Sequence, residues 1–127
     1  MASTNSDYLE NQVIEGLIRN ATKYLAIFTS NPSFETGAGG TEATGGGYVR
    51  KACAFDVPSE GATANSAQIE WTLGTDIGAG TYTGWALYDN TTGGNMLFGD
   101  TFSASRTLAT TGDKLRFSAG AITYSNT

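Results

Sequence analysis

The sequence predicts a mainly β fold, an antiparallel β-sandwich or jelly roll of seven or eight strands preceded by one N-terminal α-helix. The composition favours strands and turns over helices, since the chain has 19 threonines and 17 glycines but only two prolines. Apolar and polar residues alternate over several segments, the period of a strand with one buried face. Glycine-containing turns separate these segments at roughly ten-residue spacing, as in sandwiches and jelly rolls.

The length of 127 residues fits one compact domain. Its parts are an N-terminal arm with a helix, residues 1–22, and a β-sandwich, residues 23–127. A chain of this size buries about two-thirds of its unfolded surface and needs no covalent staples. That agrees with Cys53 being the single cysteine.

The helix is expected over residues 9–19, where the apolar residues form one stripe: Leu9, Val13, Ile14, Leu17 and Ile18. Ser3 to Ser6 offer N-caps, and Asn20 is a plausible C-cap. An isolated helix of this length is marginal in water, so the stripe must dock on something. Its own sheet is one candidate, and a neighbouring subunit is the other.

The first strand is predicted from Lys23 to Thr29, where both faces are apolar. A strand covered on both sides lies in the centre of a sheet, and the preceding helix is the natural cover for one side. A glycine-rich connection follows over residues 31–47. It lacks the Lys-Ser/Thr and the helix of a phosphate-binding loop, so we interpret it as a surface loop.

The remaining strands follow at short intervals. In 48–55, Arg50 and Lys51 point to opposite faces, so at least one lies near an edge or interface. In 67–73, the inward side chains are Ala67, Ile69, Trp71 and Leu73. Segments 82–89 and 95–102 form a hairpin that brings Trp85, Leu87, Tyr88, Leu97 and Phe98 together. Shorter strands are expected at 106–108, 115–117 and 121–124.

Composition excludes most catalytic chemistry. The chain has no histidine, so it has no Ser-His-Asp triad, no Cys-His pair and no imidazole metal ligand. Carboxylates such as Asp56 and Glu60 show no spacing that selects an acid–base pair, and Asp89 and Asp100 lack a calcium-loop register. We therefore expect no enzyme activity, no cofactor, no metal and no small-molecule substrate.

Charge and hydropathy limit the kinds of partner that the protein can bind. The net charge of −5 argues against binding to nucleic acid and against binding to an anionic membrane surface. No apolar run reaches the roughly 20 residues of a membrane span, and the N-terminus lacks a signal-peptide pattern. We expect a soluble protein made in the cytoplasm. Exposed aromatics such as Trp85, Tyr82 and Tyr88 could stack on sugar rings, but a domain this small needs most of them, Trp71 included, in its core.

Three stretches carry a resemblance to a known family. They are YLAIFTSNP (24–32) leading into GGGYVR (45–50), GWALYD (84–89) followed by GGNMLF (93–98), and GDKLRF (112–117). Together they resemble small virion proteins of tailed bacteriophages, often labelled tail fibre proteins and similar to jelly-roll capsid cement or decoration proteins. The resemblance runs from Leu9 to Tyr124 and implies no catalytic residues.

The resemblance implies a structural role in the virion. We expect a capsid cement protein on the capsid surface, made in the host cytoplasm, that clamps the major capsid protein across capsomer boundaries as a homodimer or homotrimer. The alternatives are a tail-associated fibre or adaptor component and a carbohydrate-binding module. The chain has no internal repeat, which favours the capsid over a fibrous tail. The candidate interface residues are Tyr8, Phe34, Glu35, Arg50, Lys51 and Arg106.

Overall fold

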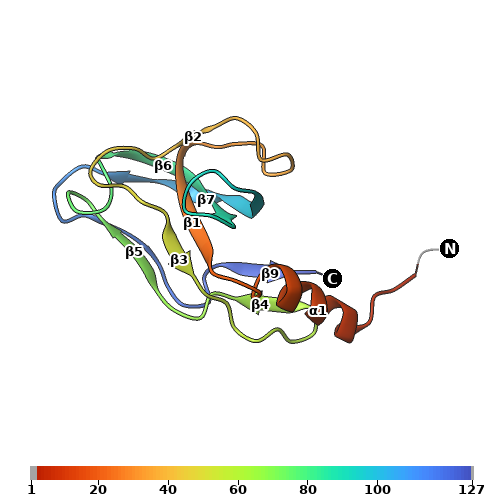
Figure 1. Cartoon of the computed structure of the whole chain (residues 1–127). Coiled ribbons are helices and arrows are strands. Elements are labelled where there is room, and N and C mark those ends of the chain that lie inside the picture. Colours follow the sequence, from red (N-terminus) through yellow and green to blue (C-terminus); the bar gives the residue numbers. More distant parts are fainter. Residues whose placement is uncertain (1–2, 127) are drawn as a thin grey trace.

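The computed structural model describes residues 3–126, which form one N-terminal helix and nine strands in three antiparallel sheets (Figure 1). The helix α1 spans Asp7–Leu17. The strands are β1 (Lys23–Ser30), β2 (Thr41–Glu42), β3 (Lys51–Cys53), β4 (Ala62–Ala64), β5 (Ile69–Thr72), β6 (Gly80–Tyr88), β7 (Met96–Leu108), β8 (Lys114–Phe117) and β9 (Thr123–Ser125). The predicted mainly β class with an N-terminal helix is therefore confirmed, with more strands than the expected seven or eight.

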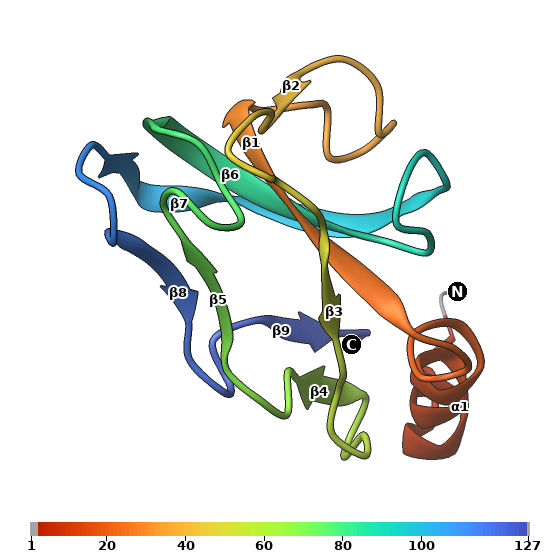
Figure 2. The ribbon, with the colours of Figure 1, turned by 60° about the vertical axis from the view of Figure 1, so that its left-hand side comes forward.

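The largest sheet has five strands, in the order β2-β1-β6-β7, with β3 also paired to β1. Strand β1 pairs with β6 along one edge and with β2 and β3 along the other, so its predicted central position is confirmed. The other sheets are the pairs β4-β9 and β5-β8. Figure 2 shows these short pairs lying across from β1, β6 and β7, with the core between them.

Trp71 lies at the centre of that core and is fully buried, as the alternation in 67–73 predicts. Its ring meets Phe117 edge-on at 6.1 Å, and Phe117 in turn meets Trp85 of the large sheet at 6.3 Å. The indole Nε1 donates a hydrogen bond of 2.9 Å to the Val49 carbonyl. The polar atom of the largest core side chain is thus satisfied inside the protein.

The outer face of the large sheet carries a second apolar cluster, and the loop after β1 covers it. The cluster consists of Ala26, Phe28, Ala86 and Tyr88, with Met96 against it. Phe34 packs directly on Gly99. A Cβ added at Gly99 would lie 2.8 Å from the Cδ1 atom of Phe34. The expectation that the helix covers a face of this strand was wrong, because residues of the 31–47 connection take that place.

That connection is also more ordered than a surface loop. It contains β2, and Gly46 has a φ of 63° with its Cα against the backbone of Ile77 and Gly78. A Cβ at Gly46 would lie 2.4 Å from the Ile77 carbonyl oxygen, so only glycine fits there. The loop is therefore anchored against the segment between β5 and β6.

The segment 48–55 is less regular than predicted, since only Lys51–Cys53 pairs as a strand. The separate strand expected at 106–108 is instead the end of β7, which continues past an irregularity in its pairing with β6. Two predictions about which hairpin side chains meet were also wrong. Tyr88 lies on the outer face of the sheet, away from Leu87, and Leu97 is exposed.

Two aspartates hold turns by accepting backbone hydrogen bonds. Asp89 Oδ1 accepts from the Asn95 N–H at 2.7 Å, which closes the loop of the β6-β7 hairpin. Asp113 Oδ2 accepts from the N–H groups of Thr110 and Ala109 at 3.0 Å each. These hydrogen bonds lower the pKa of both carboxyl groups below their usual 3.8.

Replacing Trp71 tests the core directly. We expect Trp71→Ala to lower the free energy of unfolding by about 3–5 kcal/mol, because a large cavity replaces the indole and the Val49 carbonyl loses its donor. Urea denaturation followed by circular dichroism measures the change. Val57→Ala is the control, since Val57 is 72% exposed and its truncation should matter little. Equal effects of the two variants would contradict the core assignment.

The turn aspartates also make stability depend on pH. Their pKa values are lower in the folded chain than in the unfolded one, so on acidification the unfolded state takes up protons first. The stabilisation is present above about pH 4 and is lost as the pH falls through the folded-state pKa. We expect the melting temperature to drop as the pH is lowered from about 5 through the folded-state pKa, with a shallower slope for Asp113→Asn. Parallel pH profiles for the two proteins would refute this role of Asp113.

Candidate self-association surface

Helix α1 directs apolar side chains both into the core and into solvent. Ser6 caps the helix, its side chain accepting from the Leu9 N–H at 3.2 Å. Ile14, and Ile18 just past the helix end, are buried in the core. Leu9 and Leu17, however, are 50% and 62% exposed. The expected single docked stripe is therefore split, because one helix face can meet the protein while the next faces outward.

The helix is fixed to the rest of the protein at the end that holds β4 and β9. The Asn11 side chain accepts a 2.8 Å hydrogen bond from the Gly61 N–H, next to β4. Glu10 is buried beside Gly61. A Cβ added at Gly61 would lie 2.8 Å from the Oε1 atom of Glu10. The helix ends at Leu17 with Ile18 as its C-cap, not at Asn20, whose side chain accepts instead from Lys23 Nζ at 2.7 Å.

The exposed apolar side chains of α1 continue onto the large sheet. Val13 and Leu17 line a small groove together with Leu97, which is 37% exposed at the start of β7. The floor of this groove is formed by Ile18, Phe98 and Tyr124. We name the surface made by Leu9, Val13, Leu17 and Leu97 the α1 patch. Contiguous exposed apolar surface of this kind marks interaction sites.

The α1 patch is also free of charged side chains of its own helix. At 100° per residue, Leu9, Val13 and Gly16 share one face of α1, from which no charged residue projects. Glu10 is the charged residue nearest to Leu17 around the helix. Glu10 is buried, and Glu15 forms an ion pair with Arg19 one turn on. Gly16 adds open backbone to this face, since nothing lies within 4 Å of where its Cβ would be.

Arg50, a predicted interface residue, is used inside the protein. Its side chain is 7% exposed, and its Nε and Nη2 each donate to the Glu42 carboxylate at 2.9 Å. Its Nη1 donates to the carbonyls of Asn90 and Gly93 in the β6-β7 loop. The guanidinium also lies 3.8 Å above the centre of the Tyr88 ring. Arg50 thus joins β2 to the hairpin loop and leaves little surface for a partner.

The same cluster includes Tyr48. Its hydroxyl donates to Glu42 Oε2 at 2.7 Å and accepts from the Ile27 N–H at 3.0 Å. Burial, and then the hydrogen bond to the Glu42 carboxylate, raise the pKa of Tyr48 well above its usual range. The phenol therefore stays neutral and acts as a structural bridge.

The other predicted interface residues lie apart from one another. Lys51 forms a 2.5 Å ion pair with Asp76, and Arg106 lies over the ring of Phe102 at 4.8 Å. Phe34 is half-buried, whereas Glu35 and Tyr8 are exposed. Within residues 3–126, no hydrogen bond or ion pair joins any two of the six candidates. Their role in binding stays a prediction, and Tyr8 is the one on α1, on a different side from Val13.

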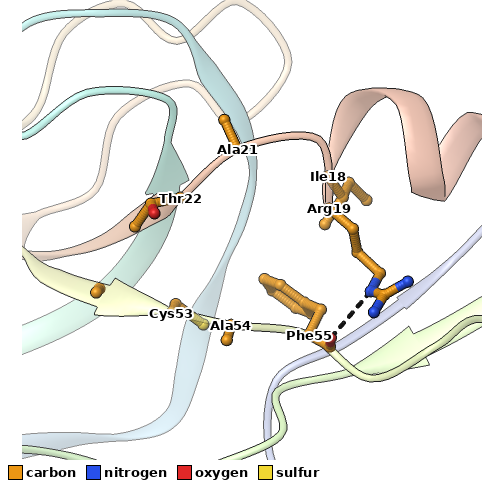
Figure 3. Close-up of a pocket in the computed structure, with 8 residues that line it drawn as sticks. Ile18, Arg19, Ala21, Thr22, Cys53, Ala54 and Phe55 are labelled. Atoms are coloured by element: carbon orange, nitrogen blue, oxygen red, sulfur yellow. Dashed lines mark hydrogen bonds between the residues drawn. The ribbon is translucent and has the colours of Figure 1, made fainter.

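A pocket beside the helix end contains Cys53, but the thiol is unreactive. Figure 3 shows the Arg19 side chain along one side of this pocket, reaching toward Phe55. Its Nε donates to the Phe55 carbonyl at 3.1 Å. Cys53 is buried, and burial raises the pKa of its thiol to about 12. At neutral pH it is therefore not a thiolate nucleophile.

The described acidic side chains do not form a metal site. In the described part of the chain, no three acidic or cysteine side chains converge as metal ligands. Asp89, considered for calcium, uses its carboxylate on Asn95. Within residues 3–126, no helix is long and apolar enough to cross a bilayer.

Comparison with protein families gives a match that covers nearly the whole chain. Residues 4–125 match the model of the family described as podophage GP4 fiber I protein gp80. No curated protein sequence matches the chain. The chain therefore belongs to this phage fibre family, whose members are virion structural proteins and not enzymes. The match supports the expected tail-associated alternative better than the capsid cement role.

Proposed function

We propose that this protein is a small building block of a podophage tail fibre and that it assembles with further copies of itself through the α1 patch. The family supplies the virion role, and the exposed apolar face of α1 supplies the means of assembly. The exposed Leu17 is the observation that carries the proposal. The Leu17 side chain is 62% exposed to solvent and lies at a groove lined by Val13 and Leu97. Such exposed apolar side chains are typical of a surface that is covered in an assembly.

The α1 patch is a place where a second copy can bind without charge repulsion. The chain carries a net charge of −5, so two copies repel each other over most of their surface. The outer face of α1 around Val13 has no charged residue, so two copies can meet there without opposing like charges. Gly16 on this face lets a neighbouring helix approach closely, within the 8–10 Å usual for packed helices.

Self-association would also increase the avidity of a fibre component for other virion proteins. Two or three copies present the same outer surfaces several times, so weak contacts to other virion proteins act at high effective concentration. A dimer and a trimer are both compatible with the α1 patch. A clamp on the major capsid protein is the competing proposal, and the abundance of the chain in virions separates the two.

The position in the virion is testable by counting. A tail-fibre component should be present in purified particles at a few dozen copies or fewer, and antibody labelling should place it at the tail. Quantitative mass spectrometry against the major capsid protein provides the copy number. Hundreds of copies per particle, spread over the shell, would favour the capsid cement role instead.

The α1 patch can be tested on the isolated protein. We expect Leu9→Ser combined with Leu17→Ser to shift the sedimenting species from an oligomer to a monomer, because apolar area that drives association is lost. Both side chains are exposed, so the melting temperature should change little.

Val57→Ser is the matched control, since it removes an apolar side chain that is 72% exposed outside the patch. It should leave the oligomer intact. A monomeric parent protein, or an unchanged oligomer in the double variant, would refute the α1 patch as the self-association surface.

A further inference from the structure

We propose that a second pocket, between strands β7 and β9, binds a neutral saccharide. It is lined by two groups of residues, and the saccharide would contact both. The first group comes from the large sheet and consists of Trp85, Phe98, Gly99 and Asp100. The second comes from the chain around β9 and consists of Ala121, Thr123, Tyr124 and Ser125. Its volume of about 270 Å³ is slightly below the range usual for ligand pockets, which suits a single sugar ring.

Aromatic rings form one wall of this pocket, and their orientation is fixed. Phe98 and Tyr124 stack with ring centres 5.0 Å apart and an angle of 30°. Trp85 meets Phe98 edge-on at 6.0 Å and Phe117 at 6.3 Å. Rings held in this way offer rigid apolar surface against the C–H face of a sugar, at little cost in side-chain entropy.

The indole N–H of Trp85 is available to a ligand. Trp71 Nε1 donates to the Val49 carbonyl, but no residue between 3 and 126 accepts from Trp85 Nε1. No buried side-chain nitrogen or oxygen among these residues lacks a partner. The Trp85 N–H must therefore reach solvent, and Trp85 is half-buried where it lines the pocket. The two tryptophans thus differ, one satisfied in the core and one with a donor to offer.

Asp100 supplies an acceptor at the exposed rim of the pocket. It pairs with Trp85 across the sheet, and strand alternation places it on the same face as Phe98. Its Oδ1 accepts from the Thr101 N–H at 2.8 Å, and no described cation lies within ion-pair distance. The carboxylate is therefore hydrated and free to accept from a ligand hydroxyl at the pocket.

These groups together select the class of ligand. A pyranose ring places its C–H face on the aromatic wall, its hydroxyls donate to the Asp100 carboxylate, and a ring or hydroxyl oxygen accepts from the Trp85 N–H. The Thr123 hydroxyl, at the same pocket, can do either. An anionic sugar would be repelled by Asp100 and by the net charge of −5. The geometry therefore points to a neutral saccharide.

The experiment uses the intact protein and an array of neutral bacterial and plant oligosaccharides. We expect at least one saccharide to bind the parent protein. Its affinity should fall tenfold or more in Asp100→Asn, because hydrogen bonds to a charged acceptor are replaced by weaker ones. Bound saccharide should also shield Trp85 from acrylamide quenching, whereas Trp71 is already buried.

Asp56→Asn is the control, since it makes the same change in charge at an exposed aspartate outside the pocket. It should bind as the parent does. Binding to no saccharide on the array, or equal affinity of the parent and Asp100→Asn, would overturn the proposal. Sedimentation of Asp100→Asn should match the parent, so this outcome is distinct from a failure of the α1 patch.

Discussion

The fold depends on β1 being enclosed on every side. Its two edges are paired, with β6 on one and with β2 and β3 on the other. Leu25 and Ile27 face the main core, whereas Ala26 and Phe28 face the outer cluster. A strand buried on both faces needs two covers, and this small chain supplies them as the short sheets on one side and the loop after β1 on the other. The placement of most other elements follows from that requirement.

The same requirement determines which side chains remain for binding. Covering the outer face brings β2 and the β6-β7 loop together, and Arg50 is buried there to join them. Lys51 is likewise paired with Asp76. Arg50 and Lys51, two of the cations that the sequence suggested for an interface, thus also form contacts within the protein. Since α1 is not needed as the cover, it lies at the end of the sheets and leaves Leu9 and Leu17 in water.

Sequence reasoning succeeded where a residue's environment is set by its neighbours along one strand. Alternation alone placed Trp71 in the core and β1 in the centre of its sheet. It failed where the outcome depends on contacts between distant segments. The Glu42 partner of Arg50 lies across a loop, and Leu97 joins the α1 patch only because β7 begins beside the helix. The apolar stripe of α1 was visible in the sequence, but periodicity could not tell its buried side from its exposed side.

The absence of repeats favoured the capsid over the tail, whereas the family match favours the tail fibre. Repeats are required of a shaft, because a long fibre must propagate one contact many times along its axis. A compact domain within a fibre meets a different demand, since it needs one surface that joins copies and others that face outward. The α1 patch and the aromatic pocket beside it fit that division, sharing Phe98 and Tyr124 as a common floor. A small domain of this kind can therefore serve a tail fibre without being fibrous itself.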